Sequence, residues 1–87
     1  MPPVHLHYWA GAKAAAGAAE ETVEAPSVRG ALELACARRP DGRLRRVLGA
    51  CSLLVDGVAA HEADLDRLLE GPVEVEVLPP FAGGSGR

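Results

Sequence analysis

The chain has 87 residues, of which 48% are hydrophobic and only 3% aromatic. This length suits one small domain with a thin core and is too short for a domain that encloses a deep catalytic cleft, so we expect function to lie on a surface or at a terminus. The net charge of -3 and the lack of a basic stripe argue against nucleic acid as a partner, because phosphates attract clustered Lys and Arg.

The first predicted elements are a strand and a loop. Hydropathy alternates over residues 4–9, with Val4, Leu6 and Tyr8 on one face, which is the period of a half-buried strand. Residues 10–19 are rich in Ala and are interrupted by glycines, so we expect a loop with one helical turn.

A second strand and the main helix follow. Residues 21–24 predict a short strand with Val23 facing the core. Ser27 offers a hydroxyl for capping, and the apolar residues after it recur at helical spacing until Pro40-Asp41-Gly42, which predicts one amphipathic helix. The apolar stripe consists of Val28, Ala31, Leu32, Ala35 and Cys36.

The next segment is ambiguous and is followed by a hairpin. Residues 44–48 keep helical spacing, but Gly49 cuts the segment short, so a helix, a single turn and an irregular connection stay open. Residues 51–55 predict a strand. Asp56-Gly57 is a dipeptide that supplies the positive φ values of a tight turn into residues 58–60.

A short helical turn over residues 63–69 and a last strand over residues 73–77 complete the domain. The last strand alternates, so its valines face the core while Glu74 and Glu76 face water. The predicted order of elements is strand, strand, helix, hairpin, short helix and strand. This is the order of a ubiquitin-like β-grasp domain of the α+β class, in which a mixed sheet packs on one main helix.

The C-terminal segment carries the most informative motif. Pro79-Pro80 is a stiff step, and Gly83-Gly84 presents bare backbone that a narrow channel in another protein can enclose. An extended segment over residues 79–84 spans roughly 20 Å. We therefore expect a β-grasp domain over residues 1–78 and a flexible tail over residues 79–87 that is handed to another protein.

Three segments resemble a known family. Tyr8-Trp9-Ala10 resembles the end of its first strand, residues 54–57 resemble its central hairpin, and residues 75–84 resemble its last strand and tail. An alternating strand followed by Leu-Pro-Pro and Gly-Gly near the end is the specific match. On these segments the chain is similar to the sulfur carriers of the MoaD/ThiS type, and most of all to the small subunit of molybdopterin synthase.

The resemblance implies that the chain is a protein co-substrate and not an enzyme. An E1-like adenylyltransferase would use ATP to adenylate Gly84, and a sulfur donor such as a cysteine desulfurase or a rhodanese would convert it to a thiocarboxylate. A larger synthase subunit would then use the sulfur for molybdopterin or a related cofactor or metabolite. No bound cofactor is expected. The residues expected to enter the partner are Pro79, Pro80, Phe81, Ala82 and Gly83.

One departure from the family is the extension Ser85-Gly86-Arg87, because it leaves Gly84 without a free carboxylate. We interpret the chain as a precursor that a protease cleaves between Gly84 and Ser85. Two alternatives stay open: a ubiquitin-like modifier that forms isopeptide bonds, and a non-covalent β-grasp interaction module.

Other chemically active side chains are expected to have structural roles. His5 and His7 share a strand face and can bind metal together with a cysteine, but surface histidines are commoner and we expect no metal site. Cys36 and Cys51 are expected to be small core residues. We expect a solvated acidic helix face and a solvated arginine cluster, for which partner docking is the alternative. The acidic residues are Glu62, Asp64, Asp66 and Glu70, and the arginines are Arg38, Arg39, Arg43, Arg45 and Arg46.

Cysteine usage and hydropathy bear on location. Two isolated cysteines fit a reducing compartment, since small secreted domains usually carry several disulfides. Residues 1–4 show no signal peptide, and no segment approaches the roughly 20 apolar residues of a membrane span. We expect a cytoplasmic protein without membrane association.

Overall fold

Residues 1–80, which the computed structural model describes, form one mixed sheet with helices packed against it. Across these residues the strands are β1 (Pro3–Tyr8), β2 (Glu20–Glu24), β3 (Ser52–Val55), β4 (Val58–Ala59) and β5 (Val73–Leu78). The helices are α1 (Ala10–Ala16), α2 (Val28–Ala37), α3 (Arg43–Leu48) and the 3-10 helix η1 (Glu62–Asp66).

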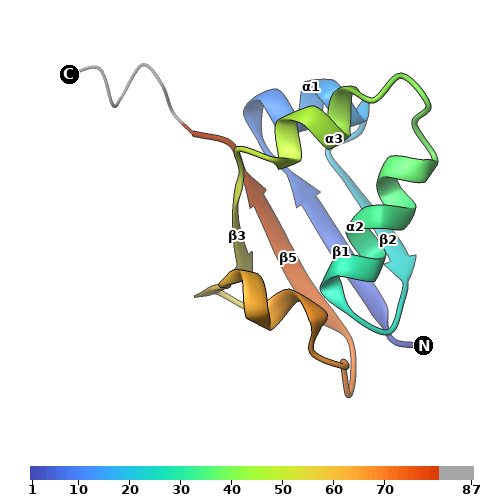
Figure 1. Ribbon diagram of the computed structural model, residues 1–87, viewed down its shortest axis with the longest axis vertical. Helices are drawn as coiled ribbons and strands as arrows, with labels where there is room; N and C mark the ends of the chain where they lie inside the picture. The colour runs from blue at the N-terminus through green and yellow to red at the C-terminus, as the bar shows by residue number, and fades with distance from the viewer. Residues whose placement is uncertain (81–87) are drawn as a thin grey trace.

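The strands lie in the order β2-β1-β5-β3-β4 (Figure 1). β1 and β5, the first and last strands of the sequence, form a parallel pair, while the other neighbours are antiparallel. The predicted mixed sheet is confirmed. Because β1 and β5 are parallel, they end at the same edge of the sheet, and the chain leaves β5 beside the end of β1 (Figure 1).

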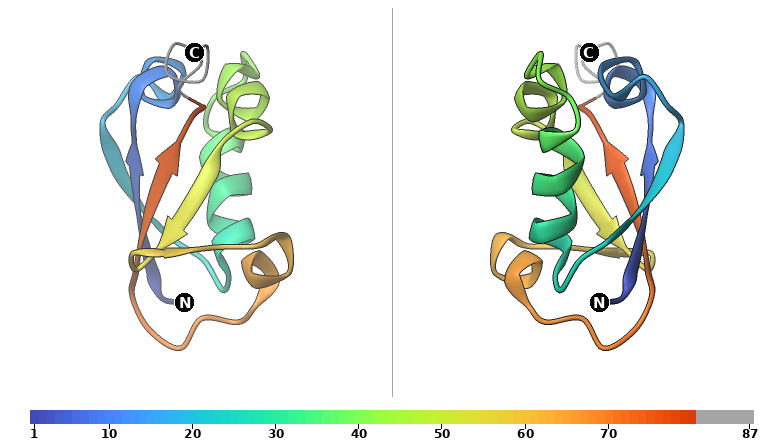
Figure 2. Two further views of the ribbon diagram at one scale, coloured as in Figure 1. Left: turned by 90° about the vertical axis from the view of Figure 1, so that its left-hand side faces the viewer. Right: turned by 90° about the vertical axis from the view of Figure 1, so that its right-hand side faces the viewer.

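The two faces of the sheet differ. The inner face packs on α2, whereas the opposite, outer face carries no helix in the described part of the chain (Figure 2). Alternation along each strand sends apolar residues inward and polar residues outward, as the period of two requires. The buried residues of the inner face are Val4, Leu6, Tyr8, Val23, Val75 and Val77.

The main helix, α2, begins where the sequence predicts. The Ser27 hydroxyl oxygen accepts a hydrogen bond from the Gly30 N–H at 3.0 Å, which satisfies one of the unpaired donors of the first turn. The predicted apolar stripe is confirmed, with Leu32 only partly buried. Its buried members are Val28, Ala31, Ala35 and Cys36.

Helix α1 corrects the prediction of a loop with one turn over residues 10–19. Seven residues form a helix, and Ala12 and Ala15 are buried. Ala has the highest helix propensity, and burial of one face outweighs the cost of Gly11 near the start. Gly17 ends the helix with φ of 75°, and its N–H donates to the Lys13 carbonyl, so this glycine terminates the helix without preventing it.

Helix α3 settles the segment that the sequence left open. Leu44 is fully buried, and α3 packs against α1 at the edge where β1 and β5 end (Figure 1). The Asp41 carboxylate accepts a hydrogen bond from the Arg43 N–H at 3.0 Å. A helix of six residues is too short to be stable alone, so tertiary packing of Leu44 maintains it.

The second half of the domain differs from prediction at two points. The Asp56-Gly57 turn has positive φ at both residues, as predicted. The helical turn ends at Asp66, and Leu68 is 75% exposed instead of contributing to an apolar face. Glu76 is half-buried and does not face water freely, because its carboxylate accepts a hydrogen bond from the Trp9 indole. No helix within residues 1–80 is long and apolar enough to cross a membrane.

Candidate functional site

The base of the tail is defined by the end of β5. Leu78 is the last residue of the strand, Pro79 is buried and Pro80 is exposed. A buried proline fixes the direction in which the chain leaves the sheet, because its ring locks φ. The other residues predicted to enter a partner or to be processed lie outside the described residues; they are Phe81, Ala82, Gly83, Gly84 and Ser85.

An apolar hollow of about 440 Å³ lies on the outer face next to this base, lined mainly by Trp9, Leu54 and Leu78. Pairing of β3 with β5 places Leu54 opposite Glu76 and Ser52 opposite Leu78. The two leucines therefore sit on the same face of the sheet. We call this feature the tail-base hollow.

Trp9 is held in place at the tail-base hollow. Its backbone N–H donates to the Val77 carbonyl at 3.2 Å, and its indole N–H donates to the Glu76 carboxylate. The side chain is nevertheless 50% exposed. A large aromatic residue that is oriented before binding and still exposed is typical of an interface anchor.

Sequence reasoning used Trp9 only as part of a motif and missed the hollow. A sign of this contact surface was present in the sequence, because alternation places Trp9 on the polar face with His5 and His7. An aromatic residue at an outward position of a half-buried strand is a sign of a contact surface. Leu54 and Leu78 could not be assigned to it without the register of β3 and β5.

A polar cluster lies on the outer face further along the same strands. His5 Nε2 is hydrogen-bonded to the Glu20 carboxylate, and His5 Nδ1 lies 3.0 Å from Glu74 Oε1. His7 Nε2 lies 3.1 Å from the same Glu74 oxygen. The bond to Glu20 and then the bond to Glu74 raise the pKa of His5 above its usual value. The two histidines thus contact glutamates, whereas the alternative weighed from the sequence, which we did not expect, combined them with a cysteine.

Two of the clustered arginines have structural roles. Arg38 and Arg39 pair with the Glu21 carboxylate at 3.0 and 2.8 Å, and the Tyr8 hydroxyl donates to it at 2.6 Å. Burial alone would raise the pKa of Glu21, but hydrogen bonds from Tyr8 and the two arginines lower it below its ordinary value. Arg39 also donates to the Ala16 carbonyl, so it ties α1 and β2 to α2.

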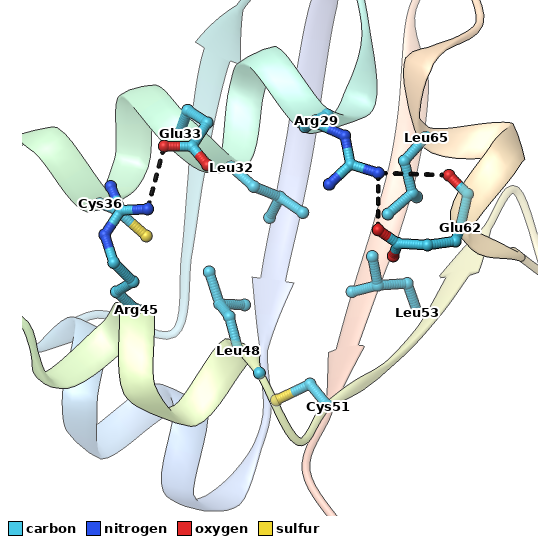
Figure 3. Close-up of a pocket in the computed structure, with 11 residues that line it drawn as sticks. Arg29, Leu32, Glu33, Cys36, Arg45, Leu48, Cys51, Leu53, Glu62 and Leu65 are labelled. Atoms are coloured by element: carbon cyan, nitrogen blue, oxygen red, sulfur yellow. Dashed lines mark hydrogen bonds and ion pairs between the residues drawn. The ribbon is translucent and has the colours of Figure 1, made fainter.

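A second hollow, of about 320 Å³, lies between α2, α3, β3 and η1 (Figure 3). Arg29 pairs with Glu62 at 2.8 Å, so part of the predicted acidic face is engaged in ion pairs. Cys36 is buried and Cys51 is partly buried, and both line this hollow. Burial raises the pKa of both thiols, which disfavours the reactive thiolate. Both cysteines therefore have the character of packing residues.

Neither a protein-family model nor a curated protein matches the chain, but solved structures do. The small archaeal modifier protein 1 from Methanosarcina acetivorans is 25% identical, with a TM-score of 0.79 over 97% of this chain and 98% of that one. The chain has the ubiquitin-like β-grasp fold.

Two further structures share this fold. A protein from Pyrococcus furiosus assigned as molybdopterin converting factor subunit 1 is 23% identical, with a TM-score of 0.73 over 93% of this chain and 100% of that one. A chain in the complex of subunits 1 and 2 of the molybdopterin-converting factor from Helicobacter pylori is 16% identical, with a TM-score of 0.66 over 91% of this chain and 95% of that one. These two likenesses show that the chain shares their fold.

Proposed function

We propose that the chain is a sulfur carrier that acts through its C-terminal glycine. Once Ser85-Gly86-Arg87 is removed, Gly84 becomes adenylated, is converted to a thiocarboxylate and supplies sulfur for molybdopterin or a related product. The observation that carries the proposal is the path of the chain. β5, a central strand of a fold shared with molybdopterin converting factor subunit 1, ends at Leu78 and is followed by the buried Pro79, four residues before Gly83-Gly84 in the sequence.

The chemistry requires partners, because the domain supplies only the carboxylate. In the activating enzyme, the Gly84 carboxylate displaces pyrophosphate from ATP. A persulfide sulfur from the donor protein then displaces AMP from the acyl carbon, and a thiol reductant cleaves the S–S bond to release the thiocarboxylate. The carbon of a carboxylate becomes an electrophile only when one of the carboxylate oxygens is converted to a leaving group, and adenylation provides that leaving group.

The tail-base hollow supplies the docking surface in this proposal. The Helicobacter pylori structure is a complex of subunits 1 and 2, and by analogy this chain binds a larger synthase subunit. Burial of Trp9 and Leu78 against that subunit would hold the base of the tail, so that residues 79–84, which span roughly 20 Å when extended, enter its active site.

A second candidate function is protein modification. It is favoured by the similarity to small archaeal modifier protein 1. In that case the activated Gly84 would form an isopeptide bond with a lysine of another protein. Lys13 is the only lysine of this chain, so self-linked chains would have one side-chain attachment point.

Intact-protein mass spectrometry tests the proposal. The chain is purified from its native host and incubated with the adenylating enzyme, ATP and a sulfur donor. A species that ends at Gly84 and gains about 16 Da, the difference between sulfur and oxygen at a terminal carboxylate, is the expected product. If the pathway is active but only the full-length chain is found, the precursor hypothesis is wrong. If Gly84 is found joined to lysines of other proteins, protein modification is favoured instead.

Two variants sharpen this test. A chain that ends at Gly84 should gain the sulfur mass without a protease, whereas a chain that ends at Pro80 should not gain it. If the chain that ends at Pro80 retains full function in the host, then neither the carrier nor the modifier is correct and a non-covalent module is left. The folded state of both variants is checked by circular dichroism.

A further inference from the structure

The outer face brings together four potential ligands or supporting side chains from three neighbouring strands. His5 and His7 are two residues apart on β1, so both imidazoles lie on the same face. Antiparallel pairing places Glu20 of β2 opposite His7, and parallel pairing places Glu74 of β5 opposite His5. These positions are 5, 7, 20 and 74 in the sequence, so only the folded sheet assembles them.

The distances between these side chains are short. One donor atom from each of His5, His7 and Glu20 lies within 4.8 Å of the other two. The two imidazole rings have their centroids 4.3 Å apart. Within residues 1–80, neither Glu20 nor Glu74 forms an ion pair with an arginine or a lysine. Two carboxylates therefore face two imidazoles, and Lys13, which lines the same open hollow as His7 and Glu20, forms no ion pair with either carboxylate.

We propose that His5, His7 and Glu20 bind a divalent transition-metal ion of the zinc class on the outer face. Two imidazoles and one carboxylate form a donor set that suits such ions. Bonds of about 2.0 to 2.1 Å in a tetrahedral site place neighbouring donors about 3.3 Å apart. The histidine side chains are 30% and 29% exposed, so small rotations can bring the three donors to this spacing.

Glu74 has a supporting role in this site. Its carboxylate lies 3.0 Å from His5 Nδ1, while His5 Nε2 faces Glu20. A carboxylate that accepts the hydrogen bond from one ring nitrogen fixes the tautomer and the ring orientation, and so presents the other nitrogen to a metal. Glu74 is thus a positioning residue that holds His5, and water completes the coordination on the exposed side.

Zinc titration of the untagged full-length chain tests this site, with Mg²⁺ as the control ion. Isothermal titration calorimetry should give one Zn²⁺ per chain and no heat with Mg²⁺. His5→Ala and His7→Ala should each lower zinc affinity by more than 100-fold, and Glu74→Gln by about 10- to 100-fold, as for other supporting carboxylates. His61→Ala is the matched control, because it removes the remaining histidine, which lies before η1, and it should leave zinc binding unchanged.

A second measurement does not depend on the variants. In the wild-type chain, substoichiometric Zn²⁺ should shift the imidazole NMR signals of His5 and His7 and leave those of His61 in place. Zinc affinity that is equal in the wild type and in His7→Ala would overturn the site. So would zinc-dependent shifts that are spread equally over all three histidines.

Discussion

Trp9→Ala should weaken docking of the chain to the proposed larger synthase subunit by about 70-fold. The side chain is 50% exposed in the free domain, so about 100 Å² of its surface is still available for burial, allowing for the Cβ that Ala retains. At about 25 cal/mol per Å² this area contributes about 2.5 kcal/mol to docking. That free energy corresponds to about a 70-fold change in Kd.

The assay is the Kd of the purified domain for the synthase subunit, measured by calorimetry on both variants. Leu68→Ala is the matched control, because Leu68 is 75% exposed but does not line the tail-base hollow. It should change Kd by less than twofold. The hollow is not the docking surface if Trp9→Ala also changes Kd by less than threefold, or if the two substitutions have equal effects. Circular dichroism of both variants confirms that loss of the bond between Trp9 and Glu76 leaves the fold intact.

Three further predictions concern the domain itself. Leu44→Ala should lower the free energy of unfolding by about 2 to 5 kcal/mol, because Leu44 is fully buried; a loss below about 1 kcal/mol in urea titration would show that α3 is not held by this contact. Gly57→Ala should lower the free energy of unfolding by about 1 to 2 kcal/mol, because Gly57 has φ of 82° in the hairpin, where a Cβ is strained. An unchanged melting temperature would contradict this prediction. Because burial raises the pKa of Cys36 and Cys51, less thiolate exists at a given pH and iodoacetamide should alkylate both more slowly in the folded chain than in urea; equal rates would show that the thiols are exposed.

Local patterns predicted the parts of the fold that local physics controls. Alternation over residues 4–9 and 73–77 identifies strands and their buried faces, because a strand turns successive side chains to opposite sides. Ser27 marks the start of α2 for an equally local reason, since its hydroxyl bonds to a backbone N–H three residues later.

The features that the sequence did not predict depend on contacts between distant segments. α3 exists because Leu44 is buried in the core and the helix packs on α1, and no window of the sequence contains that information. Glu76 looked like a solvated residue, but parallel pairing of β1 and β5 places it beside Trp9. The histidine and glutamate cluster likewise needs the register of β2, β1 and β5 at once.

The tail-base hollow and the proposed zinc site are adjacent on the outer face, and Trp9 lies between them. It lines the tail-base hollow and also an open hollow that includes His7 and Glu20. A partner that covers Trp9 therefore comes close to the proposed zinc ligands, since His7 and Trp9 are two residues apart along the backbone, about 7 Å in a strand. Because coupling between two ligands is reciprocal, docking measured with zinc and with a chelator shows whether the metal is part of the interface. An equal Kd in both conditions places the metal outside it, whereas tighter docking in zinc that His7→Ala abolishes makes the ion a contact between the two proteins.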